Sequence, residues 1–159
     1  MFSSCRYGNV LGSRGSVAHV FKEQAAQGKP ISITHRGMTR FWITLPTVAK
    51  FLLDCVGRMK GGEVFVPKMK SMGIWQMALA MTNMTNENNV HLVTGVRQGE
   101  KLQESLFCEE EYCVELQNHY EIFPQRNPEV GGMGQGQWEL QSNRNPNGDL
   151  TREELLNML

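Results

Sequence analysis

Two short blocks of the sequence place an arginine beside a glycine or a small polar residue at the edge of an apolar run. Residues 38–43 contain Arg40, and residues 97–102 contain Arg97 and Glu100. A guanidinium is a planar, charged fork that matches phosphate oxygens. A neighbouring glycine lets the backbone approach a ligand closely. Together with Glu100, the two blocks favour binding of a diphosphate joined to a hydroxylated sugar. Both arginines are equally compatible with an ordinary solvated surface.

Four blocks of the sequence, in order along the chain, form a recognisable set: residues 4–16, 38–45, 61–68 and 95–102. Together they resemble the 5-inverting UDP-N-acetylglucosamine 4,6-dehydratases. These are extended short-chain dehydrogenase/reductases of polysaccharide and glycan biosynthesis. The similarity extends to about Pro124, returns at 150–156 and covers the C-terminal half of such an enzyme.

The resemblance implies a role for five side chains in binding a UDP-sugar. Asn9 would offer its amide to the diphosphate or sugar, while Thr39 and Arg40 would face the nucleotide. Arg97 would clamp the diphosphate, and Glu100 would accept a ribose hydroxyl. From the residues alone, Asn9 is equally a turn residue at a strand end, and Glu100 is equally a carboxylate at a helix start.

The sequence also departs from the family pattern around these positions. Gln98 replaces a proline that usually precedes the glycine of the Arg97 block, which frees the backbone there. His35 stands where an aspartate is common, and Gln103 stands where a histidine is frequent. The resemblance gives Ser13 and Arg14 a supporting role in the pocket.

The chemistry of such enzymes needs two further parts. The family transfers a hydride to and from NADP or NAD, and a Tyr-x-x-x-Lys pair moves the proton. Here Tyr7, Tyr112 and Tyr120 lack a lysine four places on, and the spacing of Gly8, Gly12 and Gly15 does not fit the cofactor turn. We therefore expect no catalytic or cofactor-binding residue and no turnover by the chain alone.

Two interpretations remain open at this point. The chain is the UDP-sugar-binding portion of a dehydratase whose complementary N-terminal half is absent from it, or it is a non-catalytic remnant that binds a UDP-sugar or a partner. The resemblance implies a homo-oligomer. The cofactor turn would have to come from the complementary half.

Composition excludes several other classes of protein. The 159 residues are enough for one domain, and 16 basic residues balance 16 acidic ones, which disfavours nucleic-acid binding. The sequence shows no membrane span and no signal-peptide pattern at its start. The four cysteines form no Cys-x-x-Cys pair, so we expect free thiols, no metal site and a cytoplasmic location.

Helix and strand patterns alternate along the chain, which predicts an α/β fold. With the resemblance, this is the C-terminal part of an extended Rossmann-type reductase with its small substrate-binding subdomain and an incomplete sheet. The strand ending at Val10 should present an unpaired edge that favours self-association. The expected helices are 17–27, a segment capped by Thr44 with Pro46 in its first turn, and 74–81; the expected strands are 1–10, 31–33, 64–66, 90–96, 114–116 and 120–122.

A change in composition after residue 124 divides the chain into three expected parts. Residues 1–124 are expected to form the sugar-nucleotide-binding portion, and 125–149 a glycine-rich, mobile linker. In residues 150–159, Thr151 and Glu154 form a capping box before a short helix that should dock on the body.

Overall fold

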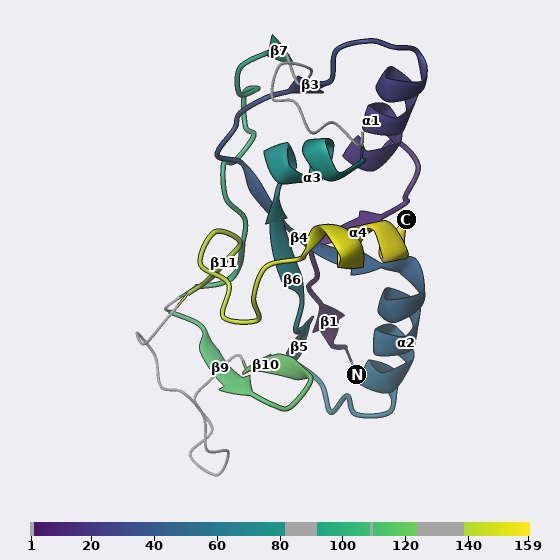
Figure 1. Ribbon diagram of the computed structural model, residues 1–159. Coiled ribbons are helices and arrows are strands. Elements are labelled where there is room, and N and C mark those ends of the chain that lie inside the picture. Colours follow the sequence, from purple (N-terminus) through teal and green to yellow (C-terminus); the bar gives the residue numbers. More distant parts are fainter. Residues whose placement is uncertain (1, 82–91, 109, 124–138) are drawn as a thin grey trace.

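A computed structural model of the protein describes residues 2–81, 92–108, 110–123 and 139–159 (Figure 1). Helices pack against mixed parallel and antiparallel strands in this part of the chain. The expected α/β class is therefore confirmed. No helix of the described ranges combines the length and apolar character needed to cross a membrane.

The larger sheet has four strands in the order β1-β5-β10-β9. Strand β1 runs parallel to β5, whereas β10 is antiparallel to both β5 and β9. Its buried face contributes Val66 and Tyr120 to an apolar cluster. The strands are β1 (Ser4–Cys5), β5 (Val64–Pro67), β9 (Tyr112–Glu115) and β10 (His119–Phe123).

A three-stranded sheet in the order β2-β4-β6 carries the first of the two arginine blocks. Strand β2 is parallel to β4, and β6 is antiparallel to β4. Helices α1, α3 and α4 lie beside this sheet (Figure 1) and contribute to one apolar cluster, whose buried members include Phe21, Trp42, Met77 and Leu155. The elements are β2 (Asn9–Leu11), β4 (Thr39–Thr44), β6 (Lys70–Gly73), α1 (Val17–Ala26), α3 (Ile74–Met81) and α4 (Arg152–Met158).

The expectation of one strand over residues 1–10 is wrong, because the segment divides between the two sheets. A Cβ at Gly8 would lie 2.5 Å from Cβ and 2.6 Å from the carbonyl oxygen of Phe41. The backbone can pass this close to β4 only where the side chain is a hydrogen. The crossing separates β1 from β2, and each is an end strand in the described strand order. The expected strand edge at Val10 is therefore present, and self-association through it stays a prediction.

The helix signals in the sequence are confirmed by the structure. Helix α2 (Leu45–Val56) begins after Thr44, whose hydroxyl oxygen accepts a hydrogen bond from the Thr47 amide at 3.3 Å. Thr151 and Glu154 form the expected reciprocal capping box at the start of α4. The Glu154 carboxylate also pairs with Lys70 of β6, and this hydrogen bond lowers the pKa of the carboxyl to about 2.

Two short strand pairs complete the described structure. Strands β3 (Ser32–Ile33) and β7 (Leu92–Val93) are parallel, and β8 (Ser105–Phe107) and β11 (Leu140–Gln141) are antiparallel. The expected strand over 90–96 contributes only β7, and part of that range lies outside the described residues. Part of the expected linker is packed into the molecule, since Leu140 and Ser142 are buried. The glycine run 131–136 lies outside the described residues.

Candidate functional site

A cleft of about 270 Å³ opens between the N-terminal end of α1, strands β2, β3 and β4, and the loop 97–100. Four of the five predicted site residues line it, although they come from three separate parts of the chain: Asn9, Arg40, Arg97 and Glu100. Ser32 and Thr34 also line it, and apolar side chains form much of the remaining wall: Val17, Val20, Phe21, Ile33, Met38 and Ile74. This mixture of an apolar wall with a few convergent polar groups is typical of small-molecule sites.

The N-terminal end of α1 contributes to one side of the cleft through Gly15 and Val17. Gly15 has a φ of 74°, a conformation that favours glycine. Ser16 is the N-cap, but its side chain makes no capping hydrogen bond, and the first turn of the helix has no acidic side chain. The partial positive charge of this helix end is therefore not neutralised by the helix itself.

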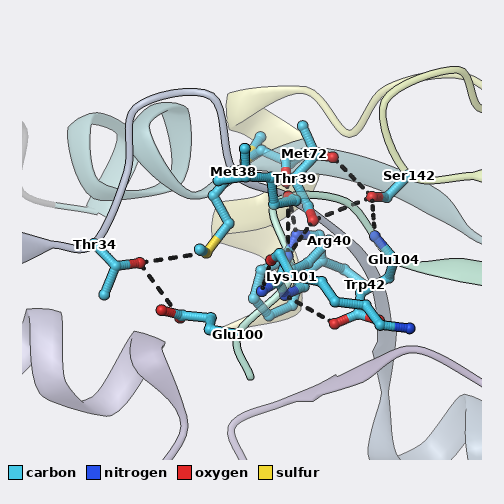
Figure 2. A network of polar contacts seen from close by, with 11 residues as sticks. Thr34, Met38, Thr39, Arg40, Trp42, Met72, Glu100, Lys101, Glu104 and Ser142 are labelled. Carbon is cyan, nitrogen blue, oxygen red and sulfur yellow. Dashed lines mark hydrogen bonds and ion pairs between the residues drawn. The ribbon is translucent and has the colours of Figure 1, made fainter. Parts of the chain in front are cut away.

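Arg40 is buried, and backbone carbonyl groups surround its guanidinium (Figure 2). One terminal nitrogen, Nη1, donates to the Thr39 carbonyl at 2.7 Å and to the Leu102 carbonyl at 3.2 Å. The other, Nη2, donates to the Lys101 carbonyl at 2.8 Å. Nε lies 3.6 Å from a carboxylate oxygen of Glu104. The side chain thus connects strand β4 to the segment 101–104.

The loop that carries Arg97 is a tight turn. The Glu100 amide donates to the Arg97 carbonyl at 3.0 Å, and Gly99 has a φ of 80°. These features are typical of a type II turn, in which the third residue needs a positive φ. The Glu100 carboxylate accepts hydrogen bonds from the Arg97 amide at 3.1 Å and from the Thr34 hydroxyl at 3.3 Å. No helix begins at Glu100, so the alternative of a helix-start carboxylate is wrong.

The two arginines of the cleft therefore differ in what they contact. The Arg97 side chain is exposed and makes no hydrogen bond or ion pair with another described residue. Arg97 is thus the cleft arginine whose guanidinium is available to a ligand within the described structure.

Thr39 does not line the cleft, and its side chain contacts the C-terminal segment instead. Its hydroxyl lies 2.7 Å from the hydroxyl of Ser142 (Figure 2). Sequence reasoning missed Ser142 and Glu104 as neighbours of the site. Neither has a distinctive sequence signal, because each is a single polar residue in a polar stretch whose partners are 38 or more residues away.

Asn9 lies at the junction of two depressions in the surface. It is exposed at the start of β2, and it lines both the first cleft and a second depression of about 310 Å³ beside Arg6 and Glu104. Ser13 and Arg14 do not line either depression. The Ser13 hydroxyl donates to the Val10 carbonyl at 2.9 Å, which closes the turn after β2.

Arg6 and Glu111 form a charged pair at the second depression. Both terminal nitrogens of Arg6 donate to the Glu111 carboxylate at 3.0 Å, and Nη1 also donates to the Leu106 carbonyl at 2.6 Å. Burial alone would raise the pKa of the Glu111 carboxyl, but the hydrogen bonds from Arg6 and the Cys108 amide outweigh it, so the pKa is lowered. This bidentate geometry fixes the loop before β9 to the N-terminal segment.

Comparison with known proteins agrees with the four sequence blocks. Residues 1–125 match the family described as polysaccharide biosynthesis protein. The chain belongs to this family. It is 46% identical over 126 residues to a UDP-N-acetylglucosamine 4,6-dehydratase (inverting) of Campylobacter jejuni, an alignment that covers 77% of this chain and 36% of that protein.

Two further relatives extend the comparison to another activity and to a solved structure. The chain is 38% identical over 119 residues to a UDP-glucose 4-epimerase of Rickettsia rickettsii, covering 74% of this chain and 35% of that protein. The X-ray structure of Pen from Bacillus thuringiensis superimposes with a TM-score of 0.81 at 31% identity, covering 99% of this chain and 48% of the other. The chain spans about a third of the length of these two curated relatives. The expected partial fold of a Rossmann-type reductase is confirmed.

Proposed function

We propose that the cleft binds the UDP part of a UDP-sugar, and that the chain supplies the substrate-binding portion of a nicotinamide-dependent UDP-N-acetylglucosamine 4,6-dehydratase of polysaccharide biosynthesis. The observation that carries the proposal is the exposed guanidinium of Arg97, which has no hydrogen bond or ion pair within the described residues, at the edge of a cleft with a largely apolar wall. The C. jejuni relative, whose name specifies this UDP-sugar, is the basis for the choice of substrate.

Binding of a diphosphate needs several hydrogen-bond donors or positive charges near its oxygens, and the described cleft offers three kinds of such group. Arg97 supplies the bidentate fork, Asn9 supplies an amide, and the N-terminal end of α1 supplies a positive partial charge. The apolar wall, which includes Phe21 and Ile33, suits the flat uracil base. The second depression beyond Asn9 leaves space for the sugar.

Arg40 has a different role in this proposal. Its donors contact carbonyl groups of the protein, so it holds the segment 101–104 in place and Arg97 contacts the ligand. The Glu100 carboxylate keeps acceptor capacity beside its two contacts within the protein, which allows it to receive a ribose hydroxyl.

In this proposal the described cleft holds one diphosphate, that of the UDP-sugar. Gly15, in the turn between β2 and α1, lines the same cleft as Arg97, so a single diphosphate would contact both. A non-catalytic module that binds a UDP-sugar is the second candidate function. The absence of a Tyr-x-x-x-Lys pair from the sequence favours it for the chain alone.

Calorimetry with UDP and uridine tests the diphosphate contact. We expect the wild type to bind UDP more tightly than uridine, and Arg97→Ala to weaken UDP binding by about ten-fold or more with little effect on uridine, because a charged hydrogen bond is lost. Arg97→Lys should also weaken UDP binding, since an ammonium group cannot form the two-pronged contact.

Arg144→Ala is the matched control, because Arg144 is also exposed but does not line the cleft. It should leave both affinities unchanged. Equal affinity of the wild type for UDP and uridine, or an Arg97→Ala variant indistinguishable from the wild type, would contradict the proposal.

A further inference from the structure

We propose that Ser142 is a positioning residue of the cleft: it fixes the segment that follows Arg97 and Glu100 against strand β4. The inference rests on the proposed function. Ser142 lies beyond residues 1–125, the part of the chain that matches the family, and it does not line the cleft. It would therefore act through the residues that it holds.

The Ser142 hydroxyl is at the centre of three hydrogen bonds (Figure 2). It donates to the Thr39 carbonyl at 3.1 Å and accepts from the Glu104 amide at 3.0 Å. The Thr39 hydroxyl, 2.7 Å away, is then the donor to the Ser142 oxygen, because a hydroxyl has one proton and two lone pairs. The side chain, 1% exposed, thus has its full hydrogen-bonding capacity satisfied.

These bonds hold the same segment that Arg40 holds from the other side. The Ser142 amide also donates to the Glu104 carbonyl at 2.9 Å, so both backbone groups of Glu104 are fixed by one residue. Arg40 binds the carbonyl groups of Lys101 and Leu102. Only a short stretch of chain then separates this anchored segment from Glu100 and the turn that carries Arg97.

Removal of the Ser142 hydroxyl should therefore affect the loop more than the core. The Glu104 amide would lose its side-chain acceptor, and a buried donor without a partner favours local rearrangement. Glu104 is followed directly by β8, whose pairing with β11 keeps the strand in place. The increased mobility should therefore affect residues 97–103, and the position of Arg97 should vary more.

Ser71 provides a matched control in the same protein. It is also 1% exposed, and its hydroxyl donates to Asp149 at 3.2 Å, so it too joins a sheet to the C-terminal segment. However, Ser71 lies in β6 and makes no hydrogen bond with residues 97–104 in the described structure. Ser71→Ala thus removes an equally buried hydroxyl, with one side-chain hydrogen bond to the C-terminal segment, without releasing the loop.

The experiment compares Ser142→Ala with Ser71→Ala in the full 159-residue chain, well below the melting temperature of either variant. Calorimetry measures the affinities for UDP and for uridine, and hydrogen exchange measures the protection of residues 97–104. We expect Ser142→Ala to bind UDP about five-fold more weakly, to bind uridine as the wild type does, and to exchange about ten-fold faster at 97–104, because the Glu104 amide loses its side-chain acceptor. Ser71→Ala should change none of these three quantities.

Thr39→Val removes the donor hydroxyl from the other side of the same hydrogen bond and serves as a second variant where Ser142→Ala does not fold. It should change UDP binding and exchange in the same direction by a smaller factor. Wild-type exchange at 97–104 in the folded Ser142→Ala variant, or an unchanged ratio of UDP to uridine affinity, would overturn the inference.

The same data separate this inference from the proposed function. If the wild type does not distinguish UDP from uridine, the diphosphate site is wrong, and the exchange of 97–104 alone then decides whether Ser142 positions the loop. If the wild type binds UDP as proposed, and Ser142→Ala and Thr39→Val equal it in UDP affinity and in exchange at 97–104, the proposed UDP site is retained and the positioning role of Ser142 is rejected.

Discussion

Strand β4 and the loop 97–100 each bring one arginine to the same cleft, but they hold it in different ways. Arg40 of β4 is buried, and three carbonyl groups and one carboxylate surround it. Arg97 is exposed on a turn that is fixed through its backbone and the Glu100 carboxylate, while its own side chain makes no hydrogen bond or ion pair with another described residue. The chain thus uses one arginine to assemble the site and leaves the other facing the solvent.

The difference follows from burial. A guanidinium carries five donors and a permanent charge, so it can be buried only where acceptors meet most of those donors. The segment 101–104 presents such acceptors, and in satisfying them Arg40 determines where the segment lies. An exposed guanidinium has no such requirement, because water satisfies its donors until a ligand displaces the water.

The largest expected effect comes from removing the buried arginine. Arg40→Ala should lower the free energy of unfolding by about 3 kcal/mol, because several buried carbonyl groups lose a charged donor. Arg97→Ala should change it by less than about 0.5 kcal/mol, as expected of an exposed side chain that has no hydrogen bond or ion pair within the described residues. Urea unfolding of both variants measures the difference. Similar values for the two would remove the distinction between an assembling and a binding arginine.

The elements of the fold were more predictable than the contacts of the site. Thr44, Pro46 and the Thr151 capping box act within one turn of chain, so their sequence signals predicted helix starts that the structure confirms. Gly8 shows the limit of such reasoning, because its contact with Phe41 is made across two strands and depends on the tertiary structure.

The same argument applies to the cleft. Arginines beside small residues indicated which side chains would gather, and four of the five predicted residues do line one cleft. The sequence could not predict that Arg40 would turn toward the Lys101 carbonyl or that Thr39 would meet Ser142. These partners are 61 and 103 residues away in sequence, and a backbone carbonyl has no residue-type signal.

Glu100 joins the loop 97–100 to the segment after β3 and should show an intermediate effect. Its carboxylate joins the Arg97 amide to the Thr34 hydroxyl after β3. Glu100→Ala should lower the free energy of unfolding by about 1 kcal/mol, since two partly exposed hydrogen bonds are lost. The turn should also lose its fixed orientation, so UDP affinity should fall further in Glu100→Ala than uridine affinity. Urea unfolding and calorimetry test both, and a variant with a wild-type preference for UDP would show that the turn keeps its orientation without this carboxylate.

The smallest effect is expected at Gln98, and it is a gain. Gln98 is the second residue of the turn closed by Arg97 and Glu100, a position at which proline fixes the backbone angle that a type II turn requires. The Gln98 amide makes no hydrogen bond to another described residue, so proline removes no contact of the described structure. Gln98→Pro should therefore raise the free energy of unfolding by about 0.4–1 kcal/mol, chiefly by restricting the unfolded chain.

Gln98→Ala is the control, because it removes the same side chain and leaves the backbone free. It should leave stability near the wild-type value. If the loop 97–100 is the looser of the two regions, proline should also strengthen UDP binding modestly without changing uridine binding, because less ordering is needed when the diphosphate arrives. A destabilised Gln98→Pro would mean that the turn departs from type II geometry in solution. A stabilised variant with unchanged UDP affinity would mean that the loop is already as well ordered as β4 before the ligand binds.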